Sequence, residues 1–187
     1  MRGAVIGIVG TLACAGAAVY FYFATGMAPV ATSAQPMPFE QLLAHKALHA
    51  RLEREMPRQV PIPPDEPHLV AGAHTYMEHC AVCHGVPGKE QTAIAKGEFP
   101  PPPHLFEGTG VTDDEPGETY WKVANGIRLT GMPGFKEHLS TTQMWEVSLL
   151  LSRADKLPES AKTVLASPGA VPLLESVGER PQSPAKP

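Results

Sequence analysis

The sequence is poor in cysteine, in charge and in β-strand patterning. Its three cysteines are too few for a disulfide framework. Charged residues make up only 18% of the chain, and the net charge is −4. A general nucleic-acid-binding protein needs a basic face to replace counterions, so that class is excluded. No segment alternates with the two-residue period of a strand, which predicts an all-α protein.

Proline is abundant, with 21 residues among 187. It is densest, for their length, in residues 29–67 and 156–187. We therefore predict one folded domain over residues 68–155, preceded by a Pro-rich linker at 29–67. The segment 156–187 is predicted to be an extended Pro/Ser-rich tail, with one short apolar patch at 171–174.

The N-terminal segment is a long uncharged run from Ala4 to Met27. As a helix it would measure about 36 Å, enough to cross a bilayer core. Arg2 precedes it and favours a cytoplasmic N-terminus, so residues 1–28 are predicted to be a single-pass transmembrane anchor. The alternative is a cleaved signal peptide, although the run is longer than a usual signal core. Cys14 lies inside the run, and we interpret it as a small apolar side chain.

Within the linker, residues 39–56 have the apolar spacing of an amphipathic helix, with Leu48 and Leu52 among the repeating positions. His45 and His49 are four residues apart and could hold a metal, but no third ligand is apparent. The helix is expected to pack on a partner subunit or back on the domain.

The motif that carries chemistry is Cys80-Ala81-Val82-Cys83-His84, a C-x-x-C-H sequence. This is the attachment motif of a c-type haem. Two thiols one helical turn apart can reach the two vinyl groups of one porphyrin edge, and the next histidine can ligate iron. A dithiol oxidoreductase needs no adjacent histidine, and a zinc site needs a second pair of ligands. One motif predicts one covalent haem c, held through Cys80 and Cys83 with His84 on the metal.

Met132 is the predicted second iron ligand. It lies in a loop between Gly131 and Pro133-Gly134, and small or rigid residues let such a loop pass close to a ring. His104 and His138 are alternative ligands.

Three helices should place these groups. They are predicted over residues 68–79, from a capping box at Thr112 to residue 125, and from a capping box at Ser140 to residue 154. Gly72 would let the helix that bears Trp145 approach the first helix closely.

Taken together, the stretch 68–155 resembles the class I single-haem cytochromes c, of the bacterial membrane-anchored or complex-bound type. The resemblance rests on YMEHCAVCHG (76–85), PPPPHLF (100–106), GETYWKVANGIR (117–128) and TGMPGF (130–135), in the family's order. It implies a small cytochrome c fold wrapped around the haem. It also implies that Pro103, in a P-x-L segment with Leu105, accepts a hydrogen bond from the axial histidine, and that Trp121 and Arg128 lie near the haem propionates.

The resemblance implies an electron carrier, not an enzyme, and a His/Met iron leaves no open position for a small-molecule substrate. The expected partners are a membrane respiratory or photosynthetic redox complex, of which the chain is a subunit or tethered donor, or another cytochrome. The expected location is the bacterial inner membrane, with the haem domain in the periplasm. The alternatives are a haem enzyme or a gas or redox sensor with a labile sixth ligand, and a structural subunit with a vestigial haem.

Overall fold

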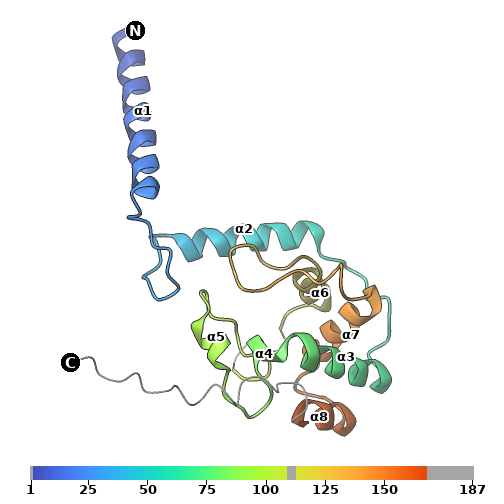
Figure 1. The fold of residues 1–187 in the computed structure, drawn as a ribbon. Coiled ribbons are helices and arrows are strands. Elements are labelled where there is room, and N and C mark those ends of the chain that lie inside the picture. Colours follow the sequence, from blue (N-terminus) through green and yellow to red (C-terminus); the bar gives the residue numbers. More distant parts are fainter. Residues whose placement is uncertain (1, 109–112, 168–187) are drawn as a thin grey trace, which may run out of the picture. The chain divides into compact units, whose positions relative to one another are not determined.

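The computed structural model describes residues 2–108 and 113–167, and these residues form helices and connecting loops without a strand. The helices are α1 (Arg2–Ala24), α2 (Glu40–Glu55), α3 (Glu66–His79), α4 (Ala81–His84), α5 (Ala93–Gly97), α6 (Pro116–Asn125), α7 (Thr141–Ser152) and α8 (Glu159–Ala166) (Figure 1). The all-α prediction is confirmed. The chain divides into two compact units, residues 1–46 and 47–187.

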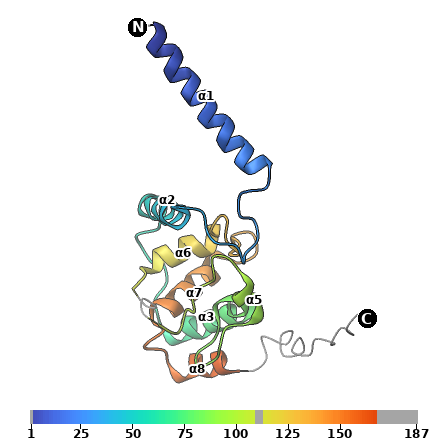
Figure 2. The ribbon, with the colours of Figure 1, turned by 90° about the vertical axis from the view of Figure 1, so that its left-hand side faces the viewer.

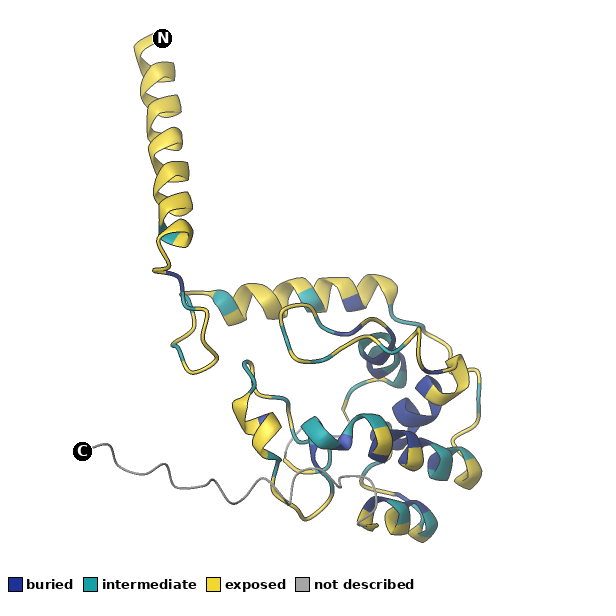
Figure 3. Ribbon diagram, viewed as in Figure 1, coloured by how far each residue is buried: buried dark blue, intermediate teal, exposed yellow. Residues whose placement is uncertain are grey.

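The first unit contains α1, which has no buried residue (Figure 3). Among the described residues it is the one helix long and apolar enough to cross a membrane, with a mean hydropathy of 2.0. Length and composition fit a membrane-spanning helix and a signal sequence equally.

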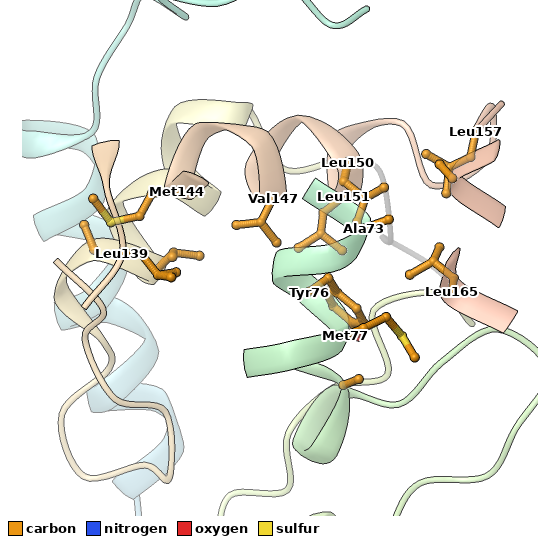
Figure 4. Packing of buried hydrophobic residues seen from close by; sticks show 14 residues of the cluster. Ala73, Tyr76, Met77, Leu139, Met144, Val147, Leu150, Leu151, Leu157 and Leu165 are labelled. Carbon is orange, nitrogen blue, oxygen red and sulfur yellow. The ribbon is translucent and has the colours of Figure 1, made fainter. Parts of the chain in front are cut away.

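The core of the second unit lies where α3 packs between α7 and α8, while α6 covers the other side of α7 (Figure 2). Ala73 and Tyr76 of α3 meet Val147 and Leu150 of α7, and all four are fully buried (Figure 4). Gly72 makes this approach possible, because a Cβ atom there would overlap the backbone carbonyl of Glu146. The predicted close contact at Gly72 is confirmed.

Helix starts follow the sequence at α3 and α7. The Asp65 side chain caps α3 by accepting a hydrogen bond from the backbone N–H of His68. Ser140 and Gln143 form a complete capping box at α7, as predicted. The start of α6 differs: it begins at Pro116, a favoured first helical residue. Its expected cap, Thr112, lies outside the described residues.

The extended tail predicted from residue 156 is wrong over its first part, because residues 159–166 form α8. Leu157, Ala161 and Leu165 are buried against α3, so this segment belongs to the core. Burial of these apolar side chains outweighs the local proline content. The remaining tail, with the apolar patch at 171–174, lies outside the described residues.

The second half of the predicted linker helix packs back on the domain. Leu52 is 3% exposed, and Glu55 accepts a hydrogen bond from the Trp121 indole N–H at 3.2 Å. Beyond the helix, the carbonyl of Pro57 lies directly over Gly117, where a Cβ atom would overlap it. Residues 52–57 of the second unit therefore form a strap that is fastened to α6.

Candidate functional site

The Cys-x-x-Cys-His segment forms a single helical turn at the end of α3. Cys80 ends α3 and begins α4, and its carbonyl accepts hydrogen bonds from the amides of Cys83 at 3.1 Å and His84 at 2.9 Å. The two cysteines are half-buried and are not in a disulfide. Residues three apart share one helix face, so both thiols can meet one edge of a planar group.

The ring of His84 is fixed by the chain that faces it. Its Nδ1 lies 2.8 Å from the carbonyl oxygen of Pro103. A carbonyl only accepts, so Nδ1 carries the proton and Nε2 keeps its lone pair for a metal. Burial lowers the pKa of His84, and the Pro103 bond offsets only part of that shift. The second contact between the two segments is the Leu105 amide, which donates to the His84 carbonyl at 3.2 Å.

The two thiols are poor nucleophiles in this setting. Burial, with the nearby Cys83, raises the pKa of Cys80 to about 12. Burial and the Glu98 carboxylate, which accepts a hydrogen bond from the Cys83 thiol at 3.3 Å, raise the pKa of Cys83 to about 11. Dithiol oxidoreductases instead depress the pKa of their attacking thiol. The environment therefore opposes that use of the motif.

The loop that carries Met132 closes at a narrow neck. Gly126 has a φ of +69°, and a Cβ atom there would lie 2.5 Å from the backbone nitrogen of Gly134. The amide of Phe135 then donates to the carbonyl of Val123 at 2.9 Å, which returns the chain to α6. Only glycine satisfies both the left-handed backbone and the close approach.

Inside the neck, the loop is held by its own hydrogen bonds. The Met132 carbonyl accepts from the Ile127 amide at 3.2 Å. The Thr130 hydroxyl donates to the Ile127 carbonyl at 2.7 Å and accepts from the Met132 amide at 3.1 Å. The thioether is thus presented by a pre-formed loop.

Several of the predicted site residues meet on one core cluster. Cys80, Leu105 and Met132 are half-buried and pack against the same group of core side chains. The predicted propionate neighbours do not join them. The Trp121 N–H is engaged by Glu55 of α2, and the exposed Arg128 makes no side-chain bond to the residues that the structure describes.

The two alternative ligands are placed differently. Both ring nitrogens of His104 are engaged, Nε2 with the Lys89 carbonyl and Nδ1 with the Phe106 amide. His138 is exposed in the loop after Met132. Neither placement favours a role as an iron ligand.

Two further residues belong to the site, and no role in it was predicted for either from the sequence. The buried Tyr76 hydroxyl donates to the Gly85 carbonyl at 2.7 Å, and its ring packs edge-on against Phe106. Glu98 reaches both the Cys83 thiol and the backbone at Gly131. Both are tertiary contacts between segments distant in sequence, so no local pattern indicates them.

An all-helical domain with a C-x-x-C-H turn, whose histidine ring is held by a backbone carbonyl, has the features of a cytochrome c domain. Residues 67–149 match the family model of cytochrome c oxidase, cbb3-type, subunit III. This stretch, somewhat less than half of the chain, is therefore similar to the cytochrome c family. The match begins in α3 and ends within α7, so α1, α2 and α8 lie outside it. No curated protein matches the chain.

The donor set fits the haem c that the family implies. Two thiols that are not in a disulfide lie one helical turn apart. The adjacent histidine has its Nδ1 hydrogen-bonded to the Pro103 carbonyl, which leaves its Nε2 for a metal. These are the groups that thioether attachment and axial ligation require.

Proposed function

We propose that the chain is a one-electron carrier, with a single haem c attached through Cys80 and Cys83 and its iron ligated by His84 and Met132. The observation that carries the proposal is the bond between His84 Nδ1 and the Pro103 carbonyl, next to the two free thiols. That bond selects the tautomer and aims the ring, which is the usual support of a metal-bound histidine.

The chain's own residues have complementary tasks. The thiols of Cys80 and Cys83 would hold the cofactor covalently, and the Pro103 carbonyl would keep the His84 ring from rotating. The neck at Gly126 and Gly134 limits how far the Met132 loop can move between redox states. A site that reorganises little suits electron transfer. The haem itself supplies the reversible one-electron change at iron.

A haem enzyme or gas sensor would need Met132 to leave the iron, or never to bind it. The internal bonds of the loop and its anchorage to Val123 oppose such a movement. If His84 and Met132 both ligated the iron, no coordination position would remain open for a substrate.

We also propose that α1 stays in place as a single-pass anchor in a bacterial inner membrane, with the N-terminus cytoplasmic and the haem domain periplasmic. Arg2 supports this orientation. The family model is described by an oxidase subunit, so a membrane oxidoreductase complex is the proposed partner, with the chain as its subunit or tethered donor. A linker that forms the helix α2, where a flexible tether would be rich in Gly and Ser, favours a subunit over a tethered shuttle.

Covalent attachment is tested by denaturing the purified protein and asking whether the haem stays with the chain. Retention in the parent and in Cys14→Ala is expected, with weakened retention in Cys80→Ala and Cys83→Ala. Haem released from the denatured parent would contradict attachment.

Ligation by Met132 is tested on the oxidised full-length protein, from its weak far-red band of sulfur-to-iron charge transfer. The band should be present in the parent, absent in Met132→Ala and kept in the control Met37→Ala, which alters a linker methionine. A parent without the band would remove Met132 from the iron and return attention to a haem enzyme or sensor.

A further inference from the structure

His104 has a tautomer fixed by its surroundings. Its side chain is 13% exposed. Nδ1 lies 3.3 Å from the Phe106 amide, which can only donate, and Nε2 lies 3.2 Å from the Lys89 carbonyl, which can only accept. Nε2 therefore donates to the Lys89 carbonyl, and Nδ1 accepts from the Phe106 amide.

The same ring lies against the residue that follows the axial histidine. A Cβ atom on Gly85 would lie 2.5 Å from the His104 Nε2 and 2.6 Å from its Cδ2. His104 is also flanked by two direct contacts to His84: the Pro103 carbonyl on the ring and the Leu105 amide on the backbone. Three consecutive residues, 103–105, thus clamp the turn at 84–85.

The segment before His104 has few backbone N–H groups that could bind it to the turn at 84–89, so a side chain has to make this contact. Residues 100–103 are four consecutive prolines, and proline has no N–H. The Gln91 side-chain amide donates to the Pro102 carbonyl at 2.7 Å. On the other side of Pro103, the first side chain that ties the segment to the 84–89 turn is His104.

We propose that His104 is a positioning residue for the axial ligand: its ring, held between Lys89, Phe106 and Gly85, keeps the Pro103 carbonyl on the Nδ1–H of His84. The proposal rests on the proposed function, in which His84 ligates the haem iron. It replaces the interpretation of His104 as an alternative ligand.

The consequence is electronic as well as geometric. A strong bond from Nδ1–H to the carbonyl makes the imidazole more basic, which favours the ferric state. When residues 103–105 hold the turn less tightly, that hydrogen bond lengthens and the imidazole donates less electron density to the iron. The ferrous state then becomes more stable relative to the ferric state. His104→Ala should therefore raise the midpoint potential and expose the His84 ring proton to solvent.

The test uses the haem-loaded full-length protein with His104→Ala, His104→Gln and the exposed control His138→Ala. The readouts are the midpoint potential and, by NMR, the exchange rate of the His84 Nδ1 proton. His104→Ala should raise the potential and speed this exchange at least tenfold relative to the backbone amides of α3. His104→Gln, whose amide can still donate to the Lys89 carbonyl, should restore part of both. His138→Ala should match the parent.

Unchanged potential and exchange in His104→Ala would overturn the proposal, as would acceleration shared equally by the α3 amides, which indicates general destabilisation. Loss of the low-spin spectrum in both His104 variants would also overturn it, because His104 would then be a ligand. If His104→Ala does not fold, His104→Gln alone carries the test. A shift of the midpoint potential in His104→Gln then supports the proposal, and an unchanged potential refutes it. Failure of the proposed function is distinguishable, because the parent itself would then show no His84 ligation.

Discussion

Gly72 offers the sharpest test of the packing that supports the C-x-x-C-H turn, because its substitution by alanine has two opposing effects. Alanine is favoured over glycine inside a helix by about 1 kcal/mol. Against this, the new methyl group would overlap the Glu146 carbonyl oxygen and lie 2.7 Å from the carbonyl carbon. The obstacle is backbone, so no side chain can rotate aside.

The size of the loss follows from the distance to be recovered. Carbon atoms in contact lie about 3.5 Å apart, so α7 would have to withdraw by roughly 1 Å, which forfeits part of every contact along the interface. Overpacking of this kind costs about 1–3 kcal/mol even where some relaxation occurs. We expect Gly72→Ala to reduce the free energy of unfolding by about 2 kcal/mol, despite the gain in helix propensity.

Thermal unfolding of the full-length protein, followed by far-UV circular dichroism, measures this change. A loss of that size corresponds to a melting temperature lower by about 8 °C for a domain of this length. The matched control is Gly97→Ala, where a Cβ atom meets nothing within 4 Å, and its melting temperature should stay close to that of the parent. A Gly72→Ala variant as stable as the parent would refute the crossing of α3 and α7 at this residue.

Three further changes test other contacts. Ser140→Ala removes the capping box of α7 and should cost about 1 kcal/mol in urea unfolding, whereas Thr141→Ala should cost much less. Burial acts to lower the pKa of Lys122, but the hydrogen bonds that its ammonium group donates to the Asp114 and Glu118 carboxylates outweigh burial and raise the pKa above its ordinary value. The parent should therefore lose stability as the pH rises through that raised value, and Lys122→Met should lack this loss. Gly117→Ala should displace the carbonyl of Pro57 and speed tryptic cleavage of the linker; a cleavage rate equal to that of the parent would argue against the strap.

Much of the fold could be predicted from the sequence because the signals were local. The capping box at Ser140 and the apolar period of α3 depend on residues within a few positions of one another, and both were found where predicted. The close approach at Gly72 was also foreseen, since a glycine within an apolar helix face indicates a crossing.

The errors occurred where tertiary burial decided the structure. Residues 159–166 lie in a Pro-rich segment, yet they form a helix because Ala161 and Leu165 are buried where this helix packs on α3. The linker helix offered two interpretations, and the burial of Leu52 together with the hydrogen bond between Glu55 and Trp121 shows that its second half packs on the domain.

The candidate site divides in the same way. The C-x-x-C-H turn is contiguous, so the sequence alone indicates it. Four consecutive prolines leave the partner of His84 ambiguous in the sequence, whereas the structure places the Pro103 carbonyl at its Nδ1. The fixed tautomer of His104 depends on Lys89, fifteen residues away, and no local pattern predicts it.

The central claim is that this chain carries one electron at a time on a haem whose two axial positions are both filled. The most direct measurement is an optical redox titration of the full-length protein, followed by exposure of the reduced form to carbon monoxide. The account predicts a single one-electron wave and no rapid carbon monoxide binding. A reduced haem that binds carbon monoxide at once, or a protein that shows no redox-active haem, would contradict it.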